Sequence, residues 1–127
     1  MKAEVEKAIE QIRASFPGKQ LTAREDGEGG AYVIVDDIEL GPPYSQDLTW
    51  VGARITFQYP YADVYPVFVR GDLARKDGQA LGEATAVGQT FEGRSAVQIS
   101  RKSNRLNPGR DTAAMKLQKV LAWLKAR

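Results

Sequence analysis

The chain has 127 residues, of which 43% are hydrophobic and 27% charged, and its formal net charge is +2. This length favours a single domain over residues 1–127, the composition is that of an ordinary globular protein, and so small a net charge does not indicate nucleic-acid binding. No apolar run approaches the length of a membrane span, and the charged start lacks the apolar centre of a signal peptide. We therefore expect a soluble cytoplasmic protein with no membrane partner.

Cysteine and histidine are both absent from the chain. The first absence excludes disulfides, a thiolate zinc site and a cysteine nucleophile. The second removes the commonest metal ligand and the commonest general base near neutral pH. No Gly-rich phosphate loop of recognised spacing is present. An enzyme built on this chain would depend on carboxylates, Lys, Ser, Thr or Tyr, and we expect no metal and no cofactor.

Residues 3–16 are predicted to form an amphipathic helix, because apolar side chains recur at intervals of three and four. The apolar stripe consists of Val5, Ala8, Ile9, Ile12 and Phe16, and Pro17-Gly18 ends the helix. The opposite side is charged, which indicates either a solvated face or a face that docks a partner. A possible short strand follows at 19–24, before a Gly-rich acidic turn at 25–30.

A strand rich in aromatic and β-branched residues is predicted at 31–35, and it continues at 38–40. Asp36 and Asp37 interrupt it. Adjacent residues of a strand point to opposite faces, so these two carboxylates cannot easily converge on one ion. We expect a polar bulge or edge at this point instead of a metal site.

The clearest strand signal lies at 50–58, where Val51, Ala53, Ile55 and Phe57 alternate with polar residues and are expected on one buried face. Two Tyr-Pro pairs and a second apolar run at 67–69 follow. Proline cannot donate to a sheet ladder, so each pair ends or edges a strand. The stretch therefore predicts a strand, a proline-bounded turn and another strand.

The pattern weakens after Arg70. Residues 71–82 are predicted to be a loop, 83–91 are ambiguous, 92–94 are typical of a turn, and the weak alternation of 95–100 indicates a short extended segment. A final helix is predicted over 112–126, with Asp111 as its N-cap. The predicted fold is α+β: a helix, an antiparallel meander of three to four strands, an irregular crossing segment and a helix.

This order of elements resembles the ubiquitin-conjugating enzyme (UBC-like) fold over nearly the whole chain. The family carries a Phe/Tyr-Pro and Tyr-Pro signature between its third and fourth strands, and the counterparts here are Phe57, Tyr59-Pro60 and Tyr65-Pro66. The resemblance implies an active-site turn at 93–97, followed by Asn107-Pro108 and the last helix. It also implies that the Tyr-Pro turn braces the segment that carries position 96.

The chain departs from the family pattern where the chemistry is expected. The two Tyr-Pro pairs are further apart than usual, the His-Pro-Asn tripeptide is replaced by Val87-Gly88-Gln89, and the nucleophile position holds Ala96. The resemblance implies a thioester on a cysteine at this position, because thiolate is both a strong nucleophile and a good leaving group. Alanine can be neither. Ser95 and Gln89 are the neighbouring side chains that could donate to an oxyanion.

Two explanations of Ala96 remain open. Either the natural protein has a cysteine at this position and this chain is a Cys→Ala variant of a conjugating enzyme, or the protein is a naturally inactive UBC-like variant that binds a ubiquitin-like protein. The resemblance is to a divergent bacterial member of the fold, of the kind found in conjugation operons, including antiviral defence operons.

The resemblance also implies the partners, which are an adenylating, ThiF-like activating enzyme and a ubiquitin-like protein. In the family the first helix recruits the activating enzyme, and here its exposed side would offer Lys2, Glu6, Lys7, Glu10 and Arg13. Nucleic acid is not expected as a partner, because no aromatic residue is interleaved in the basic stretch from 94 to 110. That stretch is interpreted as a solvated face or a face for an acidic partner.

Overall fold

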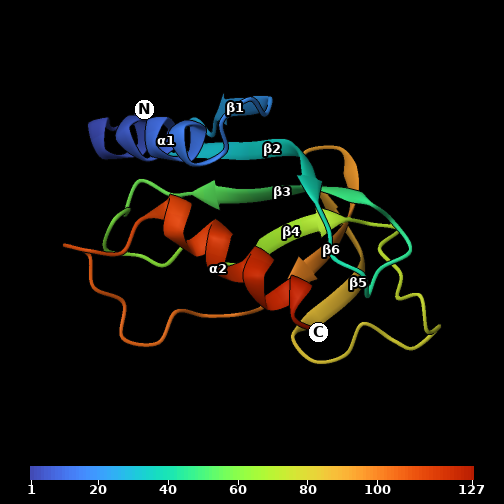
Figure 1. Cartoon of the computed structure of the whole chain (residues 1–127). Helices are drawn as coiled ribbons and strands as arrows, with labels where there is room; N and C mark the ends of the chain where they lie inside the picture. The colour runs from blue at the N-terminus through green and yellow to red at the C-terminus, as the bar shows by residue number, and fades with distance from the viewer.

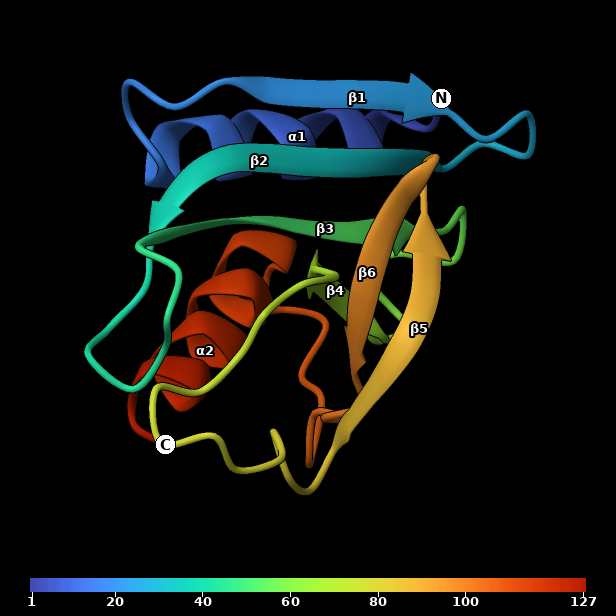
Figure 2. The same ribbon diagram turned by 90° about the vertical axis from the view of Figure 1, so that its right-hand side faces the viewer.

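The computed structural model describes residues 1–127 and contains one sheet of six antiparallel strands flanked by two helices (Figures 1 and 2). The helices are α1 (Ala3–Ser15) and α2 (Ala113–Lys125). The strands are β1 (Leu21–Glu25), β2 (Ala31–Glu39), β3 (Leu48–Ile55), β4 (Val67–Arg70), β5 (Thr85–Phe91) and β6 (Arg94–Ile99). Neither helix combines the length and the apolarity needed to cross a bilayer.

The strand order β1-β2-β3-β4-β6-β5 confirms the α+β fold and the predicted meander, which makes up the first four strands. The sheet is larger than expected, because β5 and β6 form a hairpin that adds to β4 through β6. The turn predicted at 92–94 joins β5 to β6. Glu92 and Gly93 both have positive φ, at 50° and 75°, which is the backbone of a two-residue type I′ hairpin turn.

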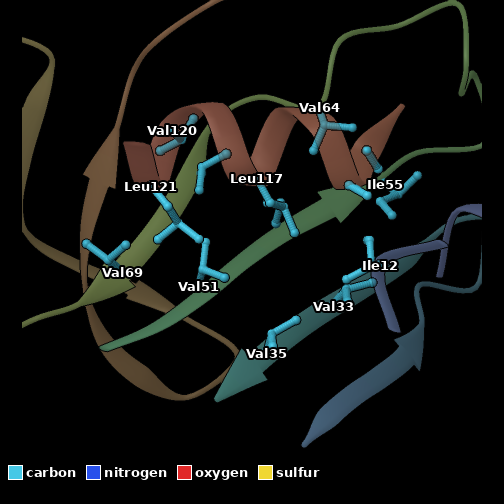
Figure 3. Close-up of a cluster of buried hydrophobic side chains, with 14 of the residues drawn as sticks. Ile12, Val33, Val35, Val51, Ile55, Val64, Val69, Leu117, Val120 and Leu121 are labelled. Carbon is cyan, nitrogen blue, oxygen red and sulfur yellow. The ribbon is translucent and has the colours of Figure 1, made fainter. Parts of the chain in front are cut away.

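Both helices cover the same face of the sheet, and the main hydrophobic core lies between them and the strands (Figures 1 and 3). Alternate residues of β2, β3 and β4 point toward α2, as the strand period requires. The residues labelled in Figure 3 show this packing: Ile12, Val33, Val35, Val51, Ile55, Val64, Val69, Leu117, Val120 and Leu121.

The opposite face carries a smaller aromatic cluster and is covered by no helix (Figure 2). Phe91 lies at its centre, stacked on Phe68 with ring centroids 4.7 Å apart and on Trp50 at 6.1 Å. Gly52 makes room for this ring, because a Cβ at that position would lie 2.7 Å from a carbon of the Phe91 ring. The β5–β6 hairpin is therefore held by packing on this face as well as by its ladder.

Two local expectations have different outcomes. The bulge at Asp36 and Asp37 is confirmed, since the register of β2 against β3 shifts between Val35 and Ile38 and Asp37 has φ 61°. The N-cap assignment was wrong. Thr112 caps α2 by accepting the N–H of Met115 at 3.1 Å, because the carboxylate of Asp111 is already engaged in accepting the N–H of Asn107.

Candidate functional site

Position 96 lies inside the sheet and not in an exposed turn. Ala96 is the third residue of β6, pairs with Arg70 of β4 and Gln89 of β5, and has 0% of its surface exposed. Its side chain packs in the aromatic-face cluster with Ile34 and Phe91. The turn expected over 93–97 ends at Gly93, and from Arg94 onward the chain is strand. The reason is that the hairpin turn needs only two residues with positive φ.

Of the three predicted catalytic positions, the structure brings Gln89 and Ala96 together but turns Ser95 away from them. Gln89 lies directly across the ladder from Ala96, so both side chains belong to the aromatic face. Ser95 precedes Ala96 in the same strand and therefore points to the other face. The amide of Gln89 donates to the carbonyl of Val87 at 3.2 Å. No arrangement of a nucleophile beside a base results from these residues.

An open groove of about 550 Å³ lies beside this region, lined on one side by Trp50. The two arginines that line the groove, Arg70 and Arg94, are each paired with a nearby carboxylate. Arg94 donates to Asp36 at 2.7 Å. Arg70 donates two hydrogen bonds to Asp72, one to each carboxylate oxygen. That hydrogen-bonded pairing holds the pKa of the Asp72 carboxyl below its usual value. The groove thus offers paired charges and no free cation.

The Tyr-Pro turn, which carries Tyr59-Pro60 and Tyr65-Pro66 between β3 and β4, contacts a different segment from the one around position 96 that we expected. Tyr59 is buried, and its hydroxyl accepts the N–H of Ala113 at 3.1 Å, at the start of α2. Asp63, in the same turn, accepts from both the N–H and the hydroxyl of Ser103 at 2.7 Å. The turn is therefore tied to α2 and to the segment before it. The expectation that it supports position 96 was wrong, because that position lies in the hairpin.

Lys116 completes this network from α2. Its side chain is only 8% exposed, and its ammonium donates to Asp63 at 3.0 Å, to the carbonyl of Arg101 at 2.7 Å and to the hydroxyl of Ser103 at 3.1 Å. Burial alone would raise the pKa of Asp63, but the hydrogen bonds from Ser103 and Lys116 outweigh it and hold that pKa below its usual value. A buried lysine is tolerated because all three of its N–H donors have acceptors.

The Tyr-Pro turn lies against the start of α1 at Lys2. The five side chains predicted to bind a partner, Lys2, Glu6, Lys7, Glu10 and Arg13, are all exposed. The ammonium of Lys2 donates to the carbonyl of Phe57 at 2.7 Å. Phe57 and Tyr61 are 50% and 77% exposed. We call the surface formed by Lys2, Phe57 and Tyr61 the α1–turn surface.

The exposure of Phe57 differs from the prediction that placed it on the buried face with Ile55. The alternation ends where the ladder ends, because β3 stops at Ile55 and the chain turns at once. The turn that follows β3 then leaves Phe57 and Tyr61 without a helix or strand to cover them. The nearby Pro60 was the local signal that the alternation should not be extended past the strand.

Comparisons with known proteins give one match. The family model described as "Prokaryotic E2 family E" matches residues 18–127, which include the whole sheet and α2. No curated protein and no solved structure matches the chain.

Proposed function

Because the chain belongs to the prokaryotic E2 family E, we propose that it serves ubiquitin-like conjugation as a docking module and forms no thioester of its own. An E2-like family implies, in general, interaction with an activating enzyme and a ubiquitin-like protein. The observation that carries the proposal is the fully buried alanine at position 96 of a chain without cysteine.

Thioester transfer needs more than a sulfur atom. The thiolate must reach the C-terminal carbonyl of another protein and must later be reached by an amine. A side chain at position 96 is enclosed by Ile34 and Phe91 and by strands on both sides. Burial in apolar surroundings also disfavours a thiolate. These conditions favour the docking module over the alternative, a conjugating enzyme in which alanine has replaced the nucleophilic cysteine.

The α1–turn surface supports the docking half of the proposal. Aromatic side chains dominate binding energy at protein interfaces, especially when polar and charged groups surround them. Phe57 and Tyr61 are the exposed aromatic residues here, and Lys2 fixes the turn against the start of α1. We propose that the activating enzyme or the ubiquitin-like protein contacts this surface.

The claim that the protein forms no thioester is tested with an Ala96→Cys variant. We expect a thiol reagent to label the introduced cysteine only on unfolding, and non-reducing gels to show no thiol-sensitive adduct with a prokaryotic activating enzyme and its ubiquitin-like protein. A Ser95→Cys variant is the matched control, because position 95 is exposed and should be labelled at once. A thiol-sensitive adduct on Ala96→Cys would overturn the docking proposal and restore the conjugating enzyme.

The docking half is tested by calorimetry with the same two proteins. A Phe57→Ala/Tyr61→Ala variant should weaken binding by at least about tenfold, since interface aromatics contribute about 1–2 kcal/mol or more each. Leu48→Ala is the control, because this 40% exposed apolar side chain lies at the opposite end of β3. Full affinity in the aromatic double variant would contradict this use of the surface.

A further inference from the structure

The charge of the chain is strongly divided along its length. Residues 101–127 contain eight Lys and Arg residues and one Asp, a net charge of +7, whereas residues 1–100 contain ten basic and fifteen acidic residues, a net charge of −5. The near-neutral total conceals this asymmetry. Such a division indicates a binding surface for the opposite charge.

The structure gathers part of the basic segment around one cavity. A hollow of about 290 Å³ lies between the segment before α2 and the flank of α2 that carries Lys116, Lys119 and Trp123. We call it the basic cavity. The charged and aromatic residues of its wall are Arg101, Lys102, Asp111, Lys116, Lys119 and Trp123.

Three cations of the basic cavity have no carboxylate partner. Arg101 lies over the Trp123 ring at 4.7 Å and Lys102 over the Tyr65 ring at 5.4 Å, contacts that leave their charges uncompensated. Lys119 is exposed on α2. Lys116 differs, because its charge is used by Asp63.

The carboxylate that lines the cavity is already engaged. Asp111 accepts the N–H of Asn107 at 2.9 Å and lies 3.7 Å from the guanidinium of Arg110. The cavity therefore keeps an excess of positive charge. The side-chain amide of Asn104 adds a neutral hydrogen-bond donor at its wall.

We propose that the basic cavity binds a carboxylate-rich segment of a protein partner. The site is separate from the α1–turn surface, so the proposal does not depend on the proposed function. Carboxylates suit it because two lysines and an arginine can each offer a charge-assisted hydrogen bond to a different acidic side chain. Since the cations are exposed, binding should be fast, modest in affinity and sensitive to salt.

Nucleic acid fits the same surface less well. Binding of single strands combines backbone contacts with bases stacked on free aromatic rings. The aromatic ring of the cavity, Trp123, already lies against the guanidinium groups of Arg101 at 4.7 Å and Arg127 at 4.3 Å.

The test is fluorescence anisotropy of a labelled twelve-residue peptide rich in Asp and Glu, at about 50 mM salt, where exposed charges are weakly screened. The Gln/Asn version of the peptide and a twelve-nucleotide single-stranded DNA serve as comparison probes. We expect the acidic peptide to bind, and a Lys102→Gln/Lys119→Gln variant to bind it about tenfold more weakly, since each exposed charge pair contributes a few-fold. The matched control is Lys76→Gln, an exposed lysine in the loop after β4.

Two-dimensional NMR of the same titration locates the peptide. The chain has two tryptophans, so the indole signal of Trp123 should shift while that of Trp50, on the aromatic face, stays in place. The proposal is overturned by absence of acidic-peptide binding, by equal binding to the double variant, by tighter binding of the DNA, or by a shift at Trp50 alone.

Discussion

Replacing Asp63 by Asn should destabilise the protein strongly, because it leaves the ammonium of Lys116 buried without a counterion. The side chains of Lys116 and Asp63 are 8% and 21% exposed. Breaking a buried ion pair from one side costs about 3–5 kcal/mol, and the residual exposure of Asp63 sets the expected loss at about 3 kcal/mol. With an unfolding entropy of about 2.1 cal/mol/K per residue, the melting temperature of this 127-residue chain should fall by about 11 °C.

Lys116→Met should cost less, about 2 kcal/mol, because Asp63 would keep both hydrogen bonds from Ser103 and some contact with water. The double variant should be more stable than the sum of the two single losses predicts, since it leaves no charge unpaired. This ordering separates an ion-pair network from a general loss of packing, in which the single losses would add.

The effect of Asp63→Asn should also depend on pH with a defined sign. Burial would raise the pKa of Asp63, but the hydrogen bonds from Ser103 and Lys116 outweigh it and hold the folded-state pKa below the unfolded value of about 3.9. A group of this kind contributes stability above the unfolded pKa, and the contribution is lost as the pH falls through the folded pKa. The stability difference between wild type and variant should therefore be full at pH 7 and shrink below about pH 4.

The assays are thermal and chemical denaturation followed by tryptophan fluorescence, at pH 7 and at several values below pH 4. Asp47→Asn is the control, because that side chain is exposed and should change stability by no more than about 0.5 kcal/mol. A melting shift of less than about 3 °C for Asp63→Asn, or a difference from wild type that does not shrink in acid, would refute the reasoning about this network.

Two further substitutions test close packing and the turn. Gly71→Ala should destabilise the protein by about 1–3 kcal/mol. The new Cβ would lie 2.5 Å from the carbonyl carbon of Ser95 and 2.7 Å from the nitrogen of Ala96. Since these are backbone atoms, a Ser95→Ala substitution added to Gly71→Ala should restore little stability in thermal melts. Tyr59→Phe should cost about 1 kcal/mol, because the buried N–H of Ala113 loses its acceptor, and an unchanged denaturation midpoint would show that this N–H finds another acceptor.

The helices and strands β2, β3 and β4 could be predicted from local patterns, because each buries a face in the core, whereas β1 buries almost nothing and gave only a weak signal. β3 illustrates this, with Val51, Ala53 and Ile55 alternating onto the core. β5 could not be predicted in the same way. It is an edge strand with a register shift between Ala86 and Gln89, Gly88 at positive φ, and Val87 66% exposed. A strand that buries little surface does not need apolar residues at every second position, so its sequence lacks the two-residue period that indicates a strand.

The network around Asp63 was missed because its members lie far apart along the chain, with Asp63 and Lys116 separated by 53 positions. One local signal was present. Lys116 lies beside Leu117 and between Ala113 and Val120 on the apolar stripe of α2. A lysine at such a position is rarely buried without a partner, so its place in the helix could have indicated a buried carboxylate even though the sequence did not identify Asp63.

The turn between β3 and β4 contributes different residues to the two surfaces proposed for partners. Its aromatic residues Phe57 and Tyr61 point outward beside α1, while Asp63 holds Ser103 and Lys116 at the edge of the basic cavity. Asp63→Asn should consequently lower stability but strengthen acidic-peptide binding, because the charge of Lys116 at the wall of the basic cavity loses its carboxylate partner. Phe57→Ala/Tyr61→Ala should leave peptide binding intact, since neither side chain contributes to the network. This difference would separate the use of the two surfaces in one protein.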